Sequence, residues 1–339
     1  MGCGVTKPVI PLQGNHEDPQ SNLDTEKQIS NSEHLKYKTE IQVSISNKPA
    51  KKTNGSTTFQ VSSHKGASAM THDNQDSYRI EEKLSDDVFF ACVLDGHGPH
   101  GALISKIATE FFVDQSKKKL EGTTFEDAEF GWDHFIESLF SECDAHISQH
   151  EDIGFRSRLS GTTATIVFIE GMVVHTGHVG DSRTILHSER NGLEIITKDH
   201  RLDDDEERLI IETKGGIVRG NGGSLRVYLS DAQKEELCLP IADQLPGLML
   251  SRTLGDELAK KAGCVAKPTV AHTNLSVKGD CFLICASDGV WDMLLNEVVV
   301  KLAQSGGIES VVQEALKSWE AVNQADNITA IMISLKDAS

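Results

Sequence analysis

The sequence has no paired cysteines and no long hydrophobic run. Its seven cysteines are scattered through 339 residues, and none forms a C-x-x-C pair. An odd, unpaired set argues against a disulfide framework and a zinc site and indicates reduced thiols, as in the cytosol. The longest apolar runs, such as 166–169 and 281–286, are far too short to cross a bilayer. We also expect no secretory signal, because no hydrophobic segment of that type occurs near the start.

Positive charge is also scarce. The chain has 33 Lys and Arg against 51 Asp and Glu, which gives a net charge of −18. Residues 1–60 are nearly neutral, so the acidic excess lies in the remainder of the chain. Such a domain is repelled by the phosphates of nucleic acid, so we expect no nucleic-acid partner. Most of these carboxylates serve solubility, and a minority is available to hold cations.

The N-terminal segment predicts a lipid anchor. The chain opens MGCGVT, which fits the M-G-x-x-x-[ST] signal for myristoylation of Gly2 after Met1 is removed. The alternative is an accidental match to a short motif. One myristoyl chain binds membranes only marginally, and Cys3 is the candidate for a second anchor, palmitate. Residues 1–57 are polar and poor in aromatics, so we predict a disordered tether on the cytoplasmic face of a membrane, with a cytosolic pool.

Residues 58–339 are predicted to form one folded domain. The apolar run 88–94 indicates a buried strand, and residues 103–112 and 132–143 repeat apolar side chains at helical spacing. Residues 162–197 predict a β-meander with hairpin turns at 170–171 and 191–192. Adjacent hairpins combined with helices favour the α+β class with antiparallel sheets.

The second half of the domain predicts further helices and strands. An acidic helix starts at the run DDDEER and closes at Gly215. This run lacks the glycine turn and final Glu of a calcium-binding loop, which argues against a calcium-binding protein. Residues 215–223 predict a glycine-rich loop without the G-K-[ST] of a nucleotide-binding loop. Strands are expected at 281–286 and 328–335, and helices at 292–303 and 308–321.

Aspartates stand at the ends of several predicted strands, namely Asp76, Asp95, Asp288 and Asp326. Each alone is an ordinary turn residue, and the Asp-Gly pair at 95–96 reads as a hairpin turn. The motifs DGHG, GDSR, SDG-x-WD and DN-[IV]-T nevertheless occur in one chain and in this order. Together they favour convergence on one rim of a sheet, where carboxylate oxygens suit the hard cations Mg²⁺ and Mn²⁺.

These motifs resemble the metal-dependent type 2C family of protein serine/threonine phosphatases over residues 60–336. The resemblance includes SGTTA (160–164), VGDSR (179–183), DH (199–200), GG (215–216), LMLSRTLGD (248–256) and SDGVWD (287–292). It implies a four-layer α+β sandwich of two antiparallel β-sheets flanked by helices. It further implies a monomeric enzyme that hydrolyses phosphoserine and phosphothreonine in proteins with water activated by two Mg²⁺ or Mn²⁺ ions.

The resemblance also implies roles for individual residues. Asp95 bridges the two metals, the Gly96 carbonyl serves the second, and Asp288 and Asp326 complete the first. Asp76 and Gln75 hold metal-bound waters, although many family members have Glu where Gln75 stands. His97 protonates the leaving alkoxide. The alternative is a histidine that only forms hydrogen bonds within a turn and has no catalytic role. A weaker third metal site uses Asp181, Asp288 and Asp292.

One position departs from the family pattern. Many members bind the substrate phosphate with an arginine that corresponds to Thr71 here. Lys65 is the candidate substitute, although lysine is a point charge without the two-pronged geometry of arginine. The alternative function is a pseudophosphatase, a scaffold that uses the same fold for binding. Degenerate members lose metal aspartates, whereas this chain keeps them, which favours the enzyme.

Overall fold

The structure is a computed structural model that describes residues 42–46, 56–66, 73–85, 87–121, 131–150, 154–220, 224–275 and 281–336. All of these belong to one compact unit, Glu40–Ser339. The lipidation candidates Gly2 and Cys3 and the departing position Thr71 lie outside the described residues. Most of the predicted tether 1–57 also lies outside them, although β1 (Gln42–Ser46) and the start of β2 (Ser56–His64) fall within that range.

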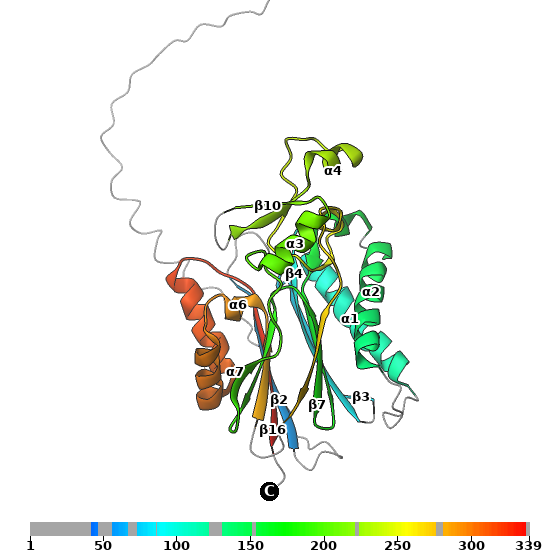
Figure 1. Cartoon of the computed structure of the whole chain (residues 1–339). Coiled ribbons are helices and arrows are strands. Elements are labelled where there is room, and N and C mark those ends of the chain that lie inside the picture. Colours follow the sequence, from blue (N-terminus) through cyan, green and yellow to red (C-terminus); the bar gives the residue numbers. More distant parts are fainter. Residues whose placement is uncertain are drawn as a thin grey trace, which may run out of the picture. The chain divides into compact units, whose positions relative to one another are not determined.

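Two large antiparallel sheets dominate the described part of the chain (Figure 1). The first has the order β1-β2-β16-β15-β8-β9. Besides β1 and β2 it contains β8 (Arg183–Ser188), β9 (Gly192–Ile195), β15 (Cys281–Ala286) and β16 (Ile328–Lys336). The predicted strands at 281–286 and 328–335 are therefore confirmed, and residues 281–286 pair with residues 330–335.

The second sheet has the order β13-β5-β4-β6-β7-β14, with β3 paired to β4. Its strands are β3 (Asp76–Ser85), β4 (Val88–His97), β5 (Gly161–Thr162), β6 (Ala164–Glu170), β7 (Val173–Val179), β13 (Leu254–Gly255) and β14 (Thr269–Asn274).

Strand β4 is buried on both faces, which explains why its sequence is apolar without alternation. Phe89 and Val93 pack between the sheets against residues such as Leu283. Phe90 and Leu94 point the other way, into a second cluster formed with the helices. Since successive side chains of a strand face opposite sides, both sets are apolar only when both faces are covered.

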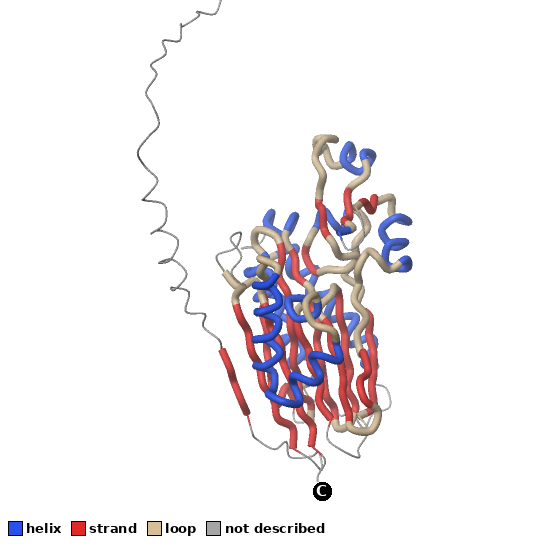
Figure 2. Tube along the Cα trace, turned by 90° about the vertical axis from the view of Figure 1, so that its left-hand side faces the viewer, coloured by secondary structure: helices blue, strands red, loops and turns tan. Residues whose placement is uncertain are grey.

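Helices cover the outer face of each sheet (Figures 1 and 2). The second sheet packs against α1 (Gly101–Leu120) and α2 (Trp132–Gln149), and the first packs against α6 (Asp288–Trp291) and α7 (Asn296–Ala321). Helix α7 is interrupted at Gly307, whose φ is 70°, between the two helices predicted there. This arrangement confirms the four-layer α+β sandwich. Among the described residues, no helix is long and apolar enough to span a membrane.

The predicted single β-meander is wrong at its centre. The hairpins β6–β7 and β8–β9 form as expected, with Gly171 and Gly192 at positive φ in their turns. However, β7 and β8 belong to different sheets. The chain crosses between the sheets at residues 180–182, where Gly180 has a φ of 94°. This crossing places Asp181 at the ends of both sheets.

A small subdomain rises above one end of the sandwich (Figure 1). The predicted glycine-rich loop contains β10 (Ile217–Arg219), which pairs with β11 (Arg226–Tyr228) and through it with β12 (Pro246–Leu248). This sheet was not predicted from the sequence, because its strands have only three residues each. Nearby lie the 3₁₀ helix η1 (Gly154–Leu159) and the helices α3 (Asp205–Thr213), α4 (Asp231–Glu236) and α5 (Glu257–Lys261).

Candidate active site

A cavity of about 500 Å³ brings the predicted site residues together. Its wall contains Gln75, Asp95, Gly96, His97, Asp181, Asp288, Asp292 and Asp326. Asp76 is buried directly behind this wall, where it pairs with Asp95 across β3 and β4. Aspartates that are distant along the chain therefore meet in one place.

Strand β4 carries the first part of the site. It continues through Asp95 to His97, three residues beyond the predicted end, because Gly96 and His97 pair with the short strand β5. Gly96 is required sterically: a Cβ there would lie 2.4 Å from the carbonyl oxygen of Gly101 and 2.6 Å from that of Gln75. The absence of a side chain thus lets the backbone of β4 approach the start of α1.

The other aspartates come from the first sheet. Asp288 is the first residue of α6, two positions after the end of β15, and Asp326 stands just before β16. Ser287 joins the two sheets behind them: its Oγ donates to Asp76 Oδ2 at 2.8 Å and accepts from the Thr329 amide at 3.0 Å. The neighbouring backbone N–H of Gln75 donates to Asn327 Oδ1 at 2.8 Å. These bonds hold the ends of both sheets in register at the cavity.

Burial raises the pKa of the clustered carboxyls. It raises the pKa of Asp76 to about 7 and that of Asp326 to about 6. The pKa values of Asp95 and Asp288 are also well above the usual range, first because of burial and then because of neighbouring carboxylate charges. The cluster therefore cannot carry all its negative charges near neutral pH unless cations compensate them.

The residues present fit a hard divalent cation. Asp76 Oδ1 and Asp288 Oδ1 are buried without a hydrogen-bond partner among the described residues, and buried oxygens of this kind normally have one. Within the described ranges, no three His, Cys, Asp or Glu side chains already close around a single point. An open set of carboxylate oxygens suits Mg²⁺ and Mn²⁺, which retain several water ligands.

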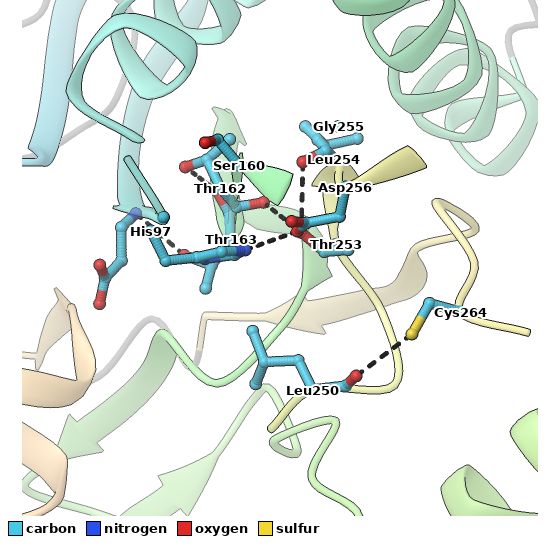
Figure 3. A network of polar contacts seen from close by, with 12 residues as sticks. His97, Ser160, Thr162, Thr163, Leu250, Thr253, Leu254, Gly255, Asp256 and Cys264 are labelled. Carbon is cyan, nitrogen blue, oxygen red and sulfur yellow. Dashed lines mark hydrogen bonds and ion pairs between the residues drawn. The ribbon is translucent and has the colours of Figure 1, made fainter. Parts of the chain in front are cut away.

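His97 is paired with a residue that the sequence did not indicate as part of the site. Its Nε2 lies 2.5 Å from Oδ2 of Asp256, which also accepts from Thr253 Oγ1 at 2.8 Å (Figure 3). Burial lowers the pKa of His97, but the charge and hydrogen bond of Asp256 outweigh it, so the net shift is upward. The motif LMLSRTLGD contained this aspartate, yet only the fold reveals its partner.

Positive charge reaches the cavity from positions that the sequence did not indicate. Arg201 lies among the carboxylates, and Arg226 reaches the wall from β11. Lys65, the predicted phosphate ligand, is exposed just after β2 and is absent from the wall as the described residues form it. The wall also contains Leu159 and residues 246–250, and Arg226 Nη1 donates to the carbonyl of Gly247 at 2.6 Å.

Comparison with known proteins is consistent with this geometry. The family model for protein phosphatase 2C matches residues 24–324. Among relatives from Arabidopsis thaliana, probable protein phosphatase 2C 1 is 28% identical over 73% of this chain and 59% of its own length. Probable protein phosphatase 2C 61 is 32% identical over 72% of this chain and 74% of its own length. The chain thus spans less than two thirds of the first of these relatives.

Solved structures share the fold. A crystal structure of serine-threonine phosphatase 2C from Toxoplasma gondii has a TM-score of 0.69 and 21% identity, covering 87% of this chain and 99% of that one. The catalytic domain of the phosphatase PstP, solved with two manganese ions, has a TM-score of 0.53 and 18% identity, covering 83% and 99%. With the family match over most of its length, this chain belongs to the protein phosphatase 2C family.

Proposed function

We propose that this chain is a metal-dependent protein serine/threonine phosphatase that hydrolyses phosphoserine and phosphothreonine in proteins. The observation that carries the proposal is the convergence of Asp95, Asp288 and Asp326 on one cavity. Family membership supports the reaction class, and the two manganese ions of PstP support the metal dependence.

The proposed roles follow the family resemblance. Asp95, Asp288 and Asp326, with the Gly96 carbonyl, would hold two Mg²⁺ or Mn²⁺ ions. When bound, such ions supply a water that is deprotonated near neutral pH and positioned for attack on phosphorus. Asp76 and Gln75 would orient water in the site. Ser287 anchors the Asp76 carboxylate, and the Gln75 side-chain amide is held by its hydrogen bond to the Gly98 carbonyl at 2.9 Å.

His97 would act on the leaving group. An alkoxide leaves poorly, so a proton from His97 is needed as the bond to phosphorus breaks. Asp256 holds the imidazole and favours its protonated form, which is the form that can donate.

The direct test is hydrolysis of a phosphothreonine peptide with Mn²⁺, with Mg²⁺ and with chelator. We expect turnover with either metal and none with chelator, and Asp95→Asn should abolish turnover while the protein remains folded. Turnover that persists in chelator would exclude the metal-dependent mechanism. A folded protein without turnover under any of these conditions would favour the pseudophosphatase scaffold instead.

We also propose that the chain acts at the cytoplasmic face of a membrane, with a cytosolic pool, as a monomer. The motif MGCGVT supports myristoylation of Gly2 and palmitoylation of Cys3. Labelled myristate should be incorporated by the full chain and not by Gly2→Ala, and Cys3→Ser should shift the protein toward the soluble fraction. Incorporation that persists in Gly2→Ala would overturn the anchor.

A further inference from the structure

Arg201 occupies the part of the cavity that the family resemblance assigns to a weaker third metal ion. Its Nη2 lies 2.9 Å from Asp181 Oδ2 and 2.5 Å from Asp292 Oδ1. One guanidinium nitrogen thus bridges two of the three carboxylates that the third ion would use. Both aspartates belong to the cavity wall, and so does Arg201.

The backbone holds Arg201 at this place. The preceding residue, His200, has a buried ring that accepts from the Gly180 amide at 3.2 Å and hydrogen-bonds Thr269 at 2.8 Å. The carbonyl of His200 accepts from the Ser251 amide at 3.2 Å, and Arg201 itself forms an isolated bridge with Leu250. The backbone at Arg201 is therefore held between the end of β7 and residues 250–251, which precede β13.

The nearest competing acid is already neutralised. Asp199 accepts two hydrogen bonds from Arg183, at 2.8 Å from Nε and 2.6 Å from Nη2. Its separation from Arg201 Nε is longer, 3.8 Å. Since Arg183 satisfies Asp199, the guanidinium of Arg201 is left to pair with Asp181 and Asp292.

We infer that Arg201 is a built-in substitute for the third divalent cation, so that this chain binds two metal ions where a third site would otherwise exist. The inference rests on the proposed metal-dependent function. A guanidinium stays charged at every physiological pH and directs its N–H groups at carboxylate oxygens. A divalent ion at the same oxygens would have to break both bonds and leave a positive charge beside itself, which opposes its binding.

Counting bound Mn²⁺ tests the inference without reference to activity. Full-length protein is dialysed to equilibrium against millimolar Mn²⁺, and the bound metal per chain is measured. We expect two ions for the unchanged chain and three for Arg201→Ala. The double variant Arg201→Ala/Asp292→Asn should return to two, because it lacks a ligand of the newly opened site.

Arg208→Ala is the matched control. Arg208 also pairs with two carboxylates, those of Asp205 and Glu212, but on the exposed face of α3 outside the cavity. This variant has the same change in net charge and also frees two carboxylates. It should keep the count of two, which separates a specific third site from general attraction of Mn²⁺ to a more acidic protein.

The outcomes separate this inference from the proposed function. Three ions on the unchanged chain, or two on a folded Arg201→Ala, would overturn the role of Arg201 and leave the metal-dependent phosphatase intact. No bound Mn²⁺ on the unchanged chain would overturn the proposed function itself. If Arg201→Ala does not fold, Arg201→Gln supplies a neutral side chain of similar reach and should also bind a third ion.

Discussion

Nε2 of His97 and Oδ2 of Asp256 lie 2.5 Å apart although the two residues are 159 positions apart in the sequence. Asp256 is buried and its backbone has a φ of 49°, the left-handed conformation that non-glycine residues rarely adopt. Gly161 lies directly against its carboxylate, where a Cβ would come within 2.1 Å of Oδ2. The backbone conformation of Asp256 and its contact with Gly161 thus restrict the position of the carboxylate that pairs with His97.

Replacement of His97 tests its role as proton donor. His97→Ala should slow hydrolysis of a phosphothreonine peptide by about 10²–10⁴-fold, the usual contribution of a positioned acid. Hydrolysis of p-nitrophenyl phosphate should change far less, because its leaving group departs without a proton. The measurement is kcat for both substrates at saturating Mn²⁺. Equal slowing of the two would contradict the acid role.

Asp256 is a positioning residue, and its effect should appear in the pH profile. Asp256 raises the pKa of His97, so in Asp256→Asn that pKa falls. As pH rises, His97 then loses its proton at a lower pH than in the unchanged chain. The alkaline limb of the pH profile for phosphopeptide hydrolysis therefore moves toward lower pH. Addition of Asp256→Asn to His97→Ala should cause little further loss. A lower kcat with an unchanged pH profile would indicate a purely structural role.

Gly161→Ala displaces the carboxylate of Asp256 without removing it. The new Cβ would overlap Oδ2, and also the carbonyl oxygen of Leu254 at 2.5 Å. We expect loss of phosphopeptide hydrolysis of the same kind as in Asp256→Asn, with p-nitrophenyl phosphate again affected less. Gly171→Ala is the control, because nothing lies within 4 Å of a Cβ at that turn, although its positive φ carries a small backbone cost. Activity of Gly161→Ala equal to that of Gly171→Ala would disprove the steric argument.

The site residues were predicted from the sequence more accurately than the strand connections that surround them. The strand ends and ordered motifs located Asp95, Asp288 and Asp326, because apolar runs and adjacent carboxylates are local signals. The change of sheet after β7 was not predictable from them, since both neighbouring hairpins have the same local pattern. The partners Asp256 and Arg201 were likewise missed, because a pairing between distant residues leaves no periodicity in the chain.

Ser287 should contribute to stability through the junction of the sheets. Ser287→Ala leaves Asp76 Oδ2 and the Thr329 amide without their partner in a buried position. An unsatisfied buried polar group costs about 1–3 kcal/mol, so the free energy of unfolding in chelator should fall by about that amount. Denaturant titration measures it. Ser305→Ala, an exposed serine on α7 that donates within its own helix, is the control and should change stability by less than about 0.5 kcal/mol.

The clustered carboxyls should make the metal-free protein less stable as pH rises. The pKa values of Asp76, about 7, and Asp326, about 6, lie above the value of about 4 expected for an unfolded aspartate. The folded state therefore binds more protons than the unfolded state between pH 4 and 7, and its stability declines as pH increases through this window. Buried histidines such as His175, whose pKa burial lowers to about 4, act in the opposite direction. In chelator, the melting temperature should therefore fall more between pH 5.5 and pH 7.5, or rise less, in the unchanged chain than in Asp76→Asn, which keeps the histidines and lacks one raised carboxyl.

Mn²⁺ should counteract this loss of stability at higher pH, because the ions compete with protons for the same carboxylates. Their apparent affinity should weaken as pH falls from 7.5 to 5.5, and binding near pH 6.5 should release protons that calorimetry in buffers of different ionisation enthalpy can count. The stabilisation by Mn²⁺ is therefore expected to be larger at pH 7.5 than at pH 5.5. Equal stabilisation at both pH values, without proton release, would show that the raised pKa values do not belong to the metal-binding carboxyls.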